Sequence, residues 1–370
     1  MGLALGLLLV LQQPIVVDGH IDTPQRMLDM KTDITARLAD GHVDVPRMKE
    51  GGLTAAFFSI WVDARYAGRA AYQRALDLIG AVRALADTNP EVELATTADQ
   101  VRAAAARGHV AALMGVEGGH AIANSLTKLD SLYGRGVRYM TLTWNNGNDW
   151  AGSSTDPKRH GGLTPFGRTV VRRMNELGML VDVSHVSDST FWDVIATTTR
   201  PVIASHSACR ALAHHPRNLS DAQLRDIAKN GGVVGINFYP VFLDEHFWHE
   251  YDELRRRLKP ETDSIRARYR GAPGESAFEV DKFVGERAES LDVPTIDRLL
   301  DHIDHAVQVM GIDHVGLGSD FDGISVLPRP MKDATSLPEL IRALQGRGYS
   351  DEDVRKILGE NFLRVLTAAP

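Results

Sequence analysis

The stretch Ile15-Val16-Val17-Asp18-Gly19-His20-Ile21-Asp22 joins a short apolar run to a His-x-Asp pair. An apolar run of this length is typical of a buried strand. The same arrangement returns near the other end of the chain, in His314-Val315-Gly316-Leu317-Gly318-Ser319-Asp320. Between the two, three more metal- or proton-handling residues follow apolar runs: Glu117, His185 and His206. Five such strand ends in one chain favour a closed ring of strands around a metal centre.

The rest of the chain alternates short apolar runs with amphipathic stretches of helical length. The predicted strands are residues 15–18, 53–61, 110–116, 137–143, 179–184, 201–205, 232–238 and 314–319. The predicted helices are residues 69–87, 98–107, 126–134, 165–178, 188–198, 220–229, 294–310, 336–345 and 351–367. Several strands are apolar on consecutive residues, as expected when both faces are covered. Eight strands alternating with helices predict an α/β fold, a single (β/α)8 TIM-type barrel, over a doubly wound sheet.

Two segments depart from this alternation. Residues 1–14 form an apolar N-terminal segment, and its first eleven residues lack the basic start and cleavage motif of a complete signal peptide. They are a signal remnant, which would make the protein exported or periplasmic, or a packed helix of a cytoplasmic protein. Residues 240–292 form a charged and aromatic insertion after strand seven of the barrel that spans 15–370. We expect it over the barrel mouth, as a lid, a dimer contact or a surface helical hairpin.

The composition excludes several classes of function. The chain of 370 residues has a net charge of -7 and a pI near 6.1, so we expect no nucleic-acid partner. Its apolar start is too short to span a membrane. The run Arg255-Arg256-Arg257 lies among acidic residues and is interpreted as a solvated helix face. One cysteine, Cys209, allows neither an internal disulfide nor a thiolate metal site.

Barrels of this type carry their active sites at the C-terminal ends of the strands. The candidate ligands there are His20, Asp22, Glu117, His185, His206 and Asp320. Imidazole and carboxylate ligands suit Zn²⁺, with Mn²⁺, Co²⁺ and Fe²⁺ as alternatives. The set is larger than one catalytic zinc uses, and two ions would use it better. The pair His302 and His305 also has ligand-like spacing, but its acidic neighbours favour a solvated helix face.

With these motifs, the chain resembles the membrane (renal) dipeptidase family of the amidohydrolase superfamily over nearly its whole length. The matching stretches are Asp18-Gly19-His20-Ile21-Asp22, Gly115-Val116-Glu117-Gly118-Gly119, Leu180-Val181-Asp182-Val183-Ser184-His185, Ser205-His206-Ser207, His215-Pro216-Arg217-Asn218, Asn237-Phe238-Tyr239, Gly318-Ser319-Asp320-Phe321-Asp322-Gly323 and Gly359-Glu360-Asn361-Phe362. Their order and spacing match as well as their residues.

The resemblance implies a binuclear zinc site with two Zn²⁺ per subunit. His20 and Asp22 would hold one ion, His185 and His206 the other, and Glu117 would bridge them. Asp320 would take a proton from the bridging water and pass it to the leaving amine. Arg217 would pair with the C-terminal carboxylate of the substrate, and Tyr239 would form part of the pocket wall. The resemblance also allows a homodimer.

One residue departs from the family pattern. Many members carry a histidine after strand four that contacts the scissile carbonyl, and this chain has Trp144 there. Tryptophan offers one N–H donor and no titratable proton. The oxyanion would then depend more on the metals or on another donor such as His160. A large aromatic side chain at this position would also narrow the pocket.

The leading hypothesis is a metal-dependent dipeptidase that cleaves L-L and L-D dipeptides through a metal-bridging hydroxide. Trp144 motivates an alternative, a barrel of the same fold acting on another amide, a lactone or an ester. A non-catalytic metal-binding barrel is the third hypothesis. The nucleophile elbow, the phosphate-binding loop and the metalloprotease helix motif are all missing from the sequence.

Overall fold

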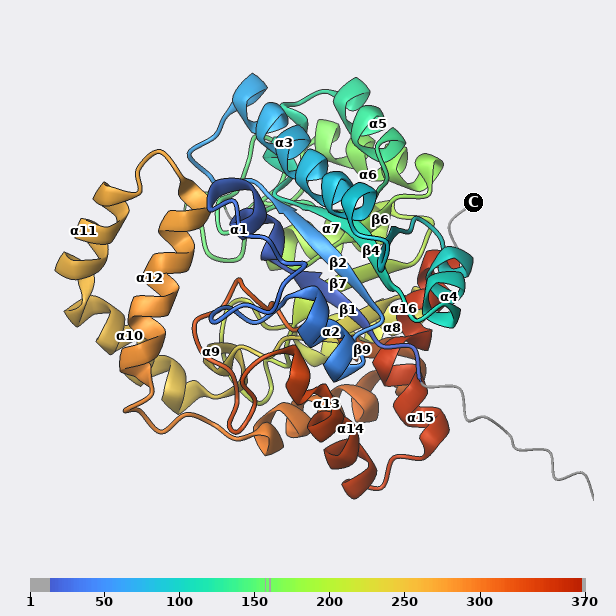
Figure 1. Cartoon of the computed structure of the whole chain (residues 1–370). Helices are drawn as coiled ribbons and strands as arrows, with labels where there is room; N and C mark the ends of the chain where they lie inside the picture. Colours follow the sequence, from blue (N-terminus) through green and yellow to red (C-terminus); the bar gives the residue numbers. More distant parts are fainter. Residues whose placement is uncertain (1–13, 157, 160, 368–370) are drawn as a thin grey trace, which may run out of the picture.

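The computed structural model describes residues 14–156, 158, 159 and 161–367. Its centre is a closed barrel of eight parallel strands (Figure 1). In their order around the barrel these are β1 (Val17–Ile21), β2 (Ala55–Trp61), β4 (Val110–Glu117), β5 (Val137–Thr141), β6 (Leu180–Asp182), β7 (Val202–Ser207), β8 (Val233–Ile236) and β9 (Val315–Leu317). The barrel closes where Asp18 of β1 pairs with Leu317 of β9. The predicted (β/α)8 barrel is confirmed.

A ninth strand lies outside this ring. β3 (Val92–Leu94) pairs in parallel with β4 and extends the sheet beyond the closed barrel. This strand was not predicted, because three residues are too few to establish a strand period. The predictions for residues 1–13 and for His160 concern positions outside the described residues.

The outer helices cover the barrel. They are α3 (Gly68–Thr88), α4 (Ala98–Ala106), α5 (Leu126–Gly134), α6 (Pro165–Leu177), α7 (Asp188–Thr197), α8 (Asp221–Lys229), α13 (Ile296–Met310), α14 (Leu337–Gly346), α15 (Asp351–Arg355) and α16 (Asn361–Thr367). Local sequence sets their ends. The Thr164 side chain accepts a hydrogen bond from the backbone N–H of Gly167, and Gly178 ends α6 with φ 76°. Ser220 and Gln223 form the capping box of α8.

Shorter elements complete the chain. They are α1 (Thr23–Asp29), α2 (Val45–Gly51), the 3-10 turns η1 (Gly119–Ile122), η2 (Ile312–His314) and η3 (Ala334–Ser336), and the π turn η4 (Lys356–Glu360). Among the described residues, no helix combines the length and the apolar character that a membrane crossing requires.

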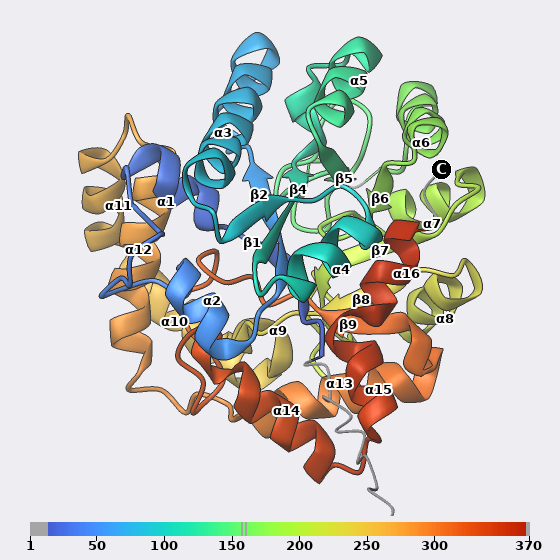
Figure 2. The ribbon, with the colours of Figure 1, turned by 45° about the vertical axis from the view of Figure 1, so that its right-hand side comes forward.

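The segment after β8 folds into four helices with their own apolar cluster. These are α9 (Pro240–Leu243), α10 (Glu245–Arg257), α11 (Lys259–Arg268) and α12 (Pro273–Ala288). Phe247, Tyr251 and Leu254 pack there against Val280 and Val284. α12 also contacts α1, which directly follows β1. Figures 1 and 2 show α10, α11 and α12 together on one side of the barrel, beside α1.

His302 corrects one expectation. It was predicted on a solvated helix face, but it is fully buried. Its Nε2–H donates to the Leu243 carbonyl at 2.8 Å, and its Nδ1 accepts from the Cys209 N–H at 3.0 Å. The acidic neighbours that suggested solvent, Asp301 and Asp304, instead pair with Arg347.

Candidate metal centre

The predicted ligands converge at the C-terminal ends of the strands. Ligand atoms of His20, Glu117 and His206 lie within 4.8 Å of one another, and so do those of His20, Asp22 and Asp320. All six predicted ligands, including His185, are buried. Residues separated by up to 300 positions therefore share one site, because β1 and β9 are neighbours in the closed barrel.

The two carboxylate oxygens of Glu117 face different residues. Its Oε2 lies 3.3 Å from His20 Nε2, and that nitrogen lies 3.5 Å from Asp22 Oδ2. Its Oε1 lies 2.9 Å from His185 Nε2 and 3.6 Å from His206 Nε2. Glu117 thus stands between a His20–Asp22 pair and a His185–His206 pair. This is the arrangement that a carboxylate shared by two cations requires.

Hydrogen bonds on the far side of each imidazole set its tautomer. Asp182 Oδ2 accepts from the Ser205 hydroxyl at 2.6 Å, so Ser205 Oγ is left to accept from His206 Nδ1 at 2.8 Å. The Nδ1–H of His185 donates to Asn145 Oδ1 at 3.2 Å. Both rings therefore turn an Nε2 lone pair toward the centre, where the two nitrogens are 3.0 Å apart. Such outer hydrogen bonds are typical of metal-binding histidines.

The Tyr139 hydroxyl sets the tautomer of the His20 ring in the same way. Its hydroxyl donates to the Gly19 carbonyl at 3.2 Å and accepts from His20 Nδ1 at 2.7 Å. Burial raises the pKa of Tyr139, which keeps the phenol protonated. The ring reaches across the barrel because β4 has Gly115 beside it, where a Cβ would lie 2.0 Å from Tyr139 Cζ. Among the described residues His20 Nε2 has no hydrogen-bond partner, although it is buried.

The donor set therefore fits cations. His20 Nε2 and Asp22 Oδ1 are buried there without a hydrogen-bond partner among the described residues, and such groups are costly unless something binds them. Burial lowers the pKa of His185 to about 4, with a contribution from Arg217, and burial also places the pKa of His206 well below its usual value. Both imidazoles are neutral at pH 7 and free to act as ligands.

The His20–Glu117 pair carries charge before any cation binds. Burial opposes a charge on His20, but Tyr139 and the carboxylates of Glu117 and Asp22 raise its pKa well above the usual value. Burial likewise opposes a charge on Glu117, but His20 and His185 hold the pKa of that carboxyl well below its usual range. Without a cation, His20 and Glu117 form a buried imidazolium–carboxylate pair.

Asp18 joins the first and last motifs. Its Oδ1 accepts backbone N–H groups from His20 at 3.0 Å and from Ser319 at 2.9 Å. His185 and Asp320 have φ of 67° and 64°, in the left-handed region that non-glycine residues seldom adopt. Backbone strain of this kind is characteristic of functional sites.

Asp320 lies beside the ligands with its own support. Its Oδ2 accepts from Asn237 Nδ2 at 3.0 Å. Burial raises the pKa of Asp320 to about 7, against the opposing effect of His20. A carboxyl that titrates near neutral pH can both accept and release a proton during a reaction.

Arg217 is buried and lines the cavity that opens onto the candidate metal centre. Its Nη2 donates to the His206 carbonyl at 3.1 Å, while its Nε has no partner among the residues described. The guanidinium lies 5.3 Å from the centre of the Phe242 ring. Burial lowers its pKa to about 10, so it stays charged at neutral pH.

A cavity of about 320 Å³ opens onto the centre. Trp144 and Tyr239 both line this cavity. The Trp144 ring is edge-on to the Trp61 ring, with 5.0 Å between the ring centres. Its outer wall comes from the α10–α12 segment, including Arg255 and Asp281. Arg255 is exposed, as expected for a solvated helix face, and it also lines the outer part of this cavity, which was not predicted.

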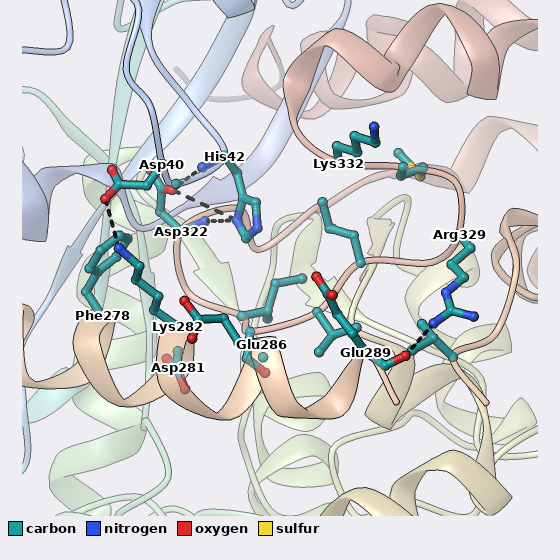
Figure 3. A pocket seen from close by; sticks show the side chains of 18 residues that line it. Asp40, His42, Phe278, Asp281, Lys282, Glu286, Glu289, Asp322, Arg329 and Lys332 are labelled. Carbon is teal, nitrogen blue, oxygen red and sulfur yellow. Dashed lines mark hydrogen bonds and ion pairs between the residues drawn. The ribbon is translucent and has the colours of Figure 1, made fainter. Parts of the chain in front are cut away.

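A second cavity of about 510 Å³ lies behind α12 (Figure 3). Phe278, Asp281 and Asp322 line both cavities, so the two adjoin. Figure 3 shows Lys282 of α12 reaching Asp40, with a 3.5 Å ion pair that ties this wall to the loop after α1.

No role was predicted for the residues that support the candidate ligands: Asp18, Tyr139, Asn145, Asp182 and Asn237. Asp182 gave a weak signal, since it is an acidic residue inside an otherwise apolar strand. The others became evident only from the packing.

The sequence and the structure were also compared with known proteins. A family model of the membrane dipeptidases (peptidase family M19) matches residues 8–370. Dipeptidase AC, a metallopeptidase of family M19, is 29% identical, with a TM-score of 0.79 over 96% of this chain and 98% of that one.

Two other structures are similar over nearly the whole chain. One is a metallopeptidase from Rhodobacter sphaeroides liganded with a phosphinate mimic of the dipeptide L-Ala-D-Ala. It is 28% identical, with a TM-score of 0.79 over 96% of this chain and 100% of that one. The probable dipeptidase PvdM from Pseudomonas aeruginosa is 28% identical, with a TM-score of 0.81 over 96% of each chain.

Proposed function

The chain belongs to the membrane dipeptidase family and is a metal-dependent dipeptidase, and we propose that it works with two zinc ions. His20 and Asp22 would hold one ion, and His185 and His206 the other. Glu117 would bridge them. The observation that carries this proposal is the division of the Glu117 oxygens between the two histidine groups. Nitrogen and oxygen ligands favour zinc, and Mn²⁺, Co²⁺ and Fe²⁺ are the alternatives.

Cations held by these residues would lower the pKa of the attacking water and polarise the scissile carbonyl. Asp320 would accept a proton from the attacking water and deliver it to the leaving amine. Two features support this role: a pKa raised to about 7 by burial, and the Asn237 hydrogen bond that fixes one carboxylate oxygen. A residue that first accepts and then donates a proton is most effective when its pKa lies near the working pH.

Arg217 would bind the C-terminal carboxylate of the dipeptide. Its guanidinium is buried, charged and held by the His206 carbonyl, with Nε left unpartnered within the described structure. The planar guanidinium group matches a carboxylate in shape and charge. Arg217 would thereby set the distance between the scissile bond and the end of the substrate, which limits the enzyme to short peptides.

The substrates would be L-L and L-D dipeptides. The Rhodobacter sphaeroides relative is liganded with a mimic of L-Ala-D-Ala, which supports the L-D class for this chain. Trp144 and Trp61 form one wall of the cavity and would exclude water from that side. Since Trp144 supplies no titratable proton, negative charge on the carbonyl oxygen would be stabilised chiefly by the cations.

A dipeptide panel tests the proposal. The zinc-loaded protein is assayed on L-Ala-L-Ala, L-Ala-D-Ala and larger L-L and L-D pairs, with and without a chelator. We expect hydrolysis that the chelator abolishes and zinc restores. Asp320→Asn should lower kcat by about 10²–10⁴-fold while zinc content is retained. A Glu117→Ala variant is compared with Glu253→Ala as its matched control, because Glu253 is an exposed glutamate on α10. Absence of hydrolysis across the panel would overturn the proposal.

Trp144 favours one competing assignment, a preference for another amide, a lactone or an ester. The same preparation is therefore assayed on an aminoacyl ester and a lactone. A kcat/KM on either far above that on every dipeptide would favour the competing substrate class.

A further inference from the structure

Arg255 is the feature of the active-site cavity that the proposed reaction leaves unexplained. It lies on α10, is exposed, and lines the outer part of the cavity. Among the residues that the structure describes, it makes no hydrogen bond and no ion pair. The other outer arginines of the cavity are engaged: Arg65 with Asp63, and Arg266 with Asp263.

Its neighbours on the same helix behave differently. Arg256 pairs with Asp252 at 3.5 Å, and Arg257 lines a separate surface depression. Of the three consecutive arginines, Arg255 alone lines the active-site cavity. Tyr239, Tyr251 and Asp281 act on its guanidinium electrostatically.

A row of aromatic rings connects Arg255 with Arg217. The guanidinium of Arg217 lies 5.3 Å from the Phe242 ring centre, and Phe242 packs against Tyr239 at 5.2 Å. Tyr239 in turn packs against Tyr251 at 5.9 Å, beside Arg255. The two guanidinium groups therefore lie along one wall of the cavity. If Arg217 holds the C-terminal carboxylate, this wall faces the side chain of the C-terminal residue.

Arg255 brings a positive charge to this wall. Asp281 lies within electrostatic range of Arg255, Arg266 and Asp22. Arg266 is paired with Asp263, whereas Asp281 forms no ion pair with Arg255 among the described residues, so the Arg255 guanidinium keeps donors without a partner. A carboxylate on the substrate side chain would supply the missing partner, and charge-assisted hydrogen bonds of this type are the stronger ones.

We propose that Arg255 selects dipeptides whose C-terminal residue has an acidic side chain. This inference rests on the proposed function, because Arg217 must hold the α-carboxylate for Arg255 to meet the side chain. A C-terminal glutamate or aspartate would present two carboxylates to the two arginines. The amide analogue fills the same space but brings no charge.

The test compares kcat/KM for L-Ala-L-Glu and L-Ala-L-Gln in the zinc-loaded protein. We expect about a tenfold preference for glutamate, the size of one charge-assisted hydrogen bond at a partly solvated site. Arg255→Gln should reduce the preference to about twofold or less. Arg257→Gln, two residues further along α10 and outside the cavity, should retain it. Zinc content and circular dichroism check that both variants are folded.

The outcomes separate this inference from the proposed function. If L-Ala-L-Ala is cleaved but L-Ala-L-Glu shows no advantage over L-Ala-L-Gln, the role of Arg255 is wrong and the dipeptidase stands. A preference that survives Arg255→Gln overturns it as well. So does a larger acidic preference at the N-terminal position, measured with L-Glu-L-Ala against L-Gln-L-Ala. If no dipeptide at all is cleaved, the proposed function itself fails.

Discussion

Removing the Tyr139 hydroxyl should weaken one half of the metal centre and leave the other half intact. The hydroxyl joins two buried groups: it accepts from His20 Nδ1 at 2.7 Å and donates to the Gly19 carbonyl at 3.2 Å. Tyr139→Phe keeps the ring that packs beside Gly115 and removes both hydrogen bonds. The change therefore affects the orientation of His20 without opening a large cavity.

The expected losses of zinc affinity and of folding free energy follow from these two hydrogen bonds. Loss of an outer hydrogen bond to a ligating histidine typically costs about 10–100-fold in metal affinity. That corresponds to about 1.4–2.8 kcal/mol. A buried group left without its partner costs about 1–3 kcal/mol of folding free energy, so the metal-free protein should also lose stability. In the proposed centre, only the ion that His20 and Asp22 would hold should be affected, since Asn145 orients His185, and Ser205, held by Asp182, orients His206.

The assay is competition for zinc against a chromophoric chelator, which resolves the two binding steps. Tyr133→Phe is the matched control, because the Tyr133 hydroxyl makes no hydrogen bond to any residue the structure describes. We expect one of the two zinc affinities to fall in Tyr139→Phe and neither to fall in Tyr133→Phe. Two unchanged affinities in Tyr139→Phe, or an equal loss at both sites, would refute the reasoning.

Three further predictions concern packing and protons. Gly115→Ala should destabilise the fold by about 3 kcal/mol in urea denaturation, because its Cβ would meet Tyr139, whereas Gly80→Ala, in open space on α3, should be neutral or stabilising by up to about 1 kcal/mol. Zinc binding at pH 7 should release about one proton from His20, because the pKa of this residue is raised well above its usual value. Titration calorimetry in buffers of different ionisation enthalpy measures this release, and a release of no proton would contradict the prediction. Burial raises the pKa of Asp281 to about 6, so its negative charge is lost below that pH and the preference for L-Ala-L-Glu over L-Ala-L-Gln should grow from pH 7.5 to pH 5.5. Asp281→Asn should show no such growth, and a preference that shrinks on acidification would contradict the charge argument.

The positions of the candidate ligands could be predicted from the sequence because each follows a strand with a clear apolar run. Strand count then made His20 and Asp320 neighbours, and the closed barrel confirms that the first and last motifs adjoin. The role of Tyr139 could not be predicted in this way. It depends on a glycine in the adjacent strand and on a side chain that crosses the barrel interior, and both are matters of register.

Arg255 shows the same limit on a helix. Three consecutive arginines point in three directions about the helix axis, and the sequence does not reveal which one faces the cavity. The packing of α10 against α12 decides this. His302 was misread for a related reason, since its acidic neighbours lie on a different face of α13 from the histidine itself.

Metal stoichiometry in the Glu117→Ala variant tests the central claim most directly. The account predicts two zinc ions per chain in the wild-type protein and in Glu253→Ala, measured by elemental analysis after dialysis against a fixed free-zinc concentration. Glu117→Ala should bind at most one, because both cation positions lose a shared ligand. Two tightly bound ions in Glu117→Ala, or a single ion in the wild-type protein, would contradict a centre bridged by Glu117.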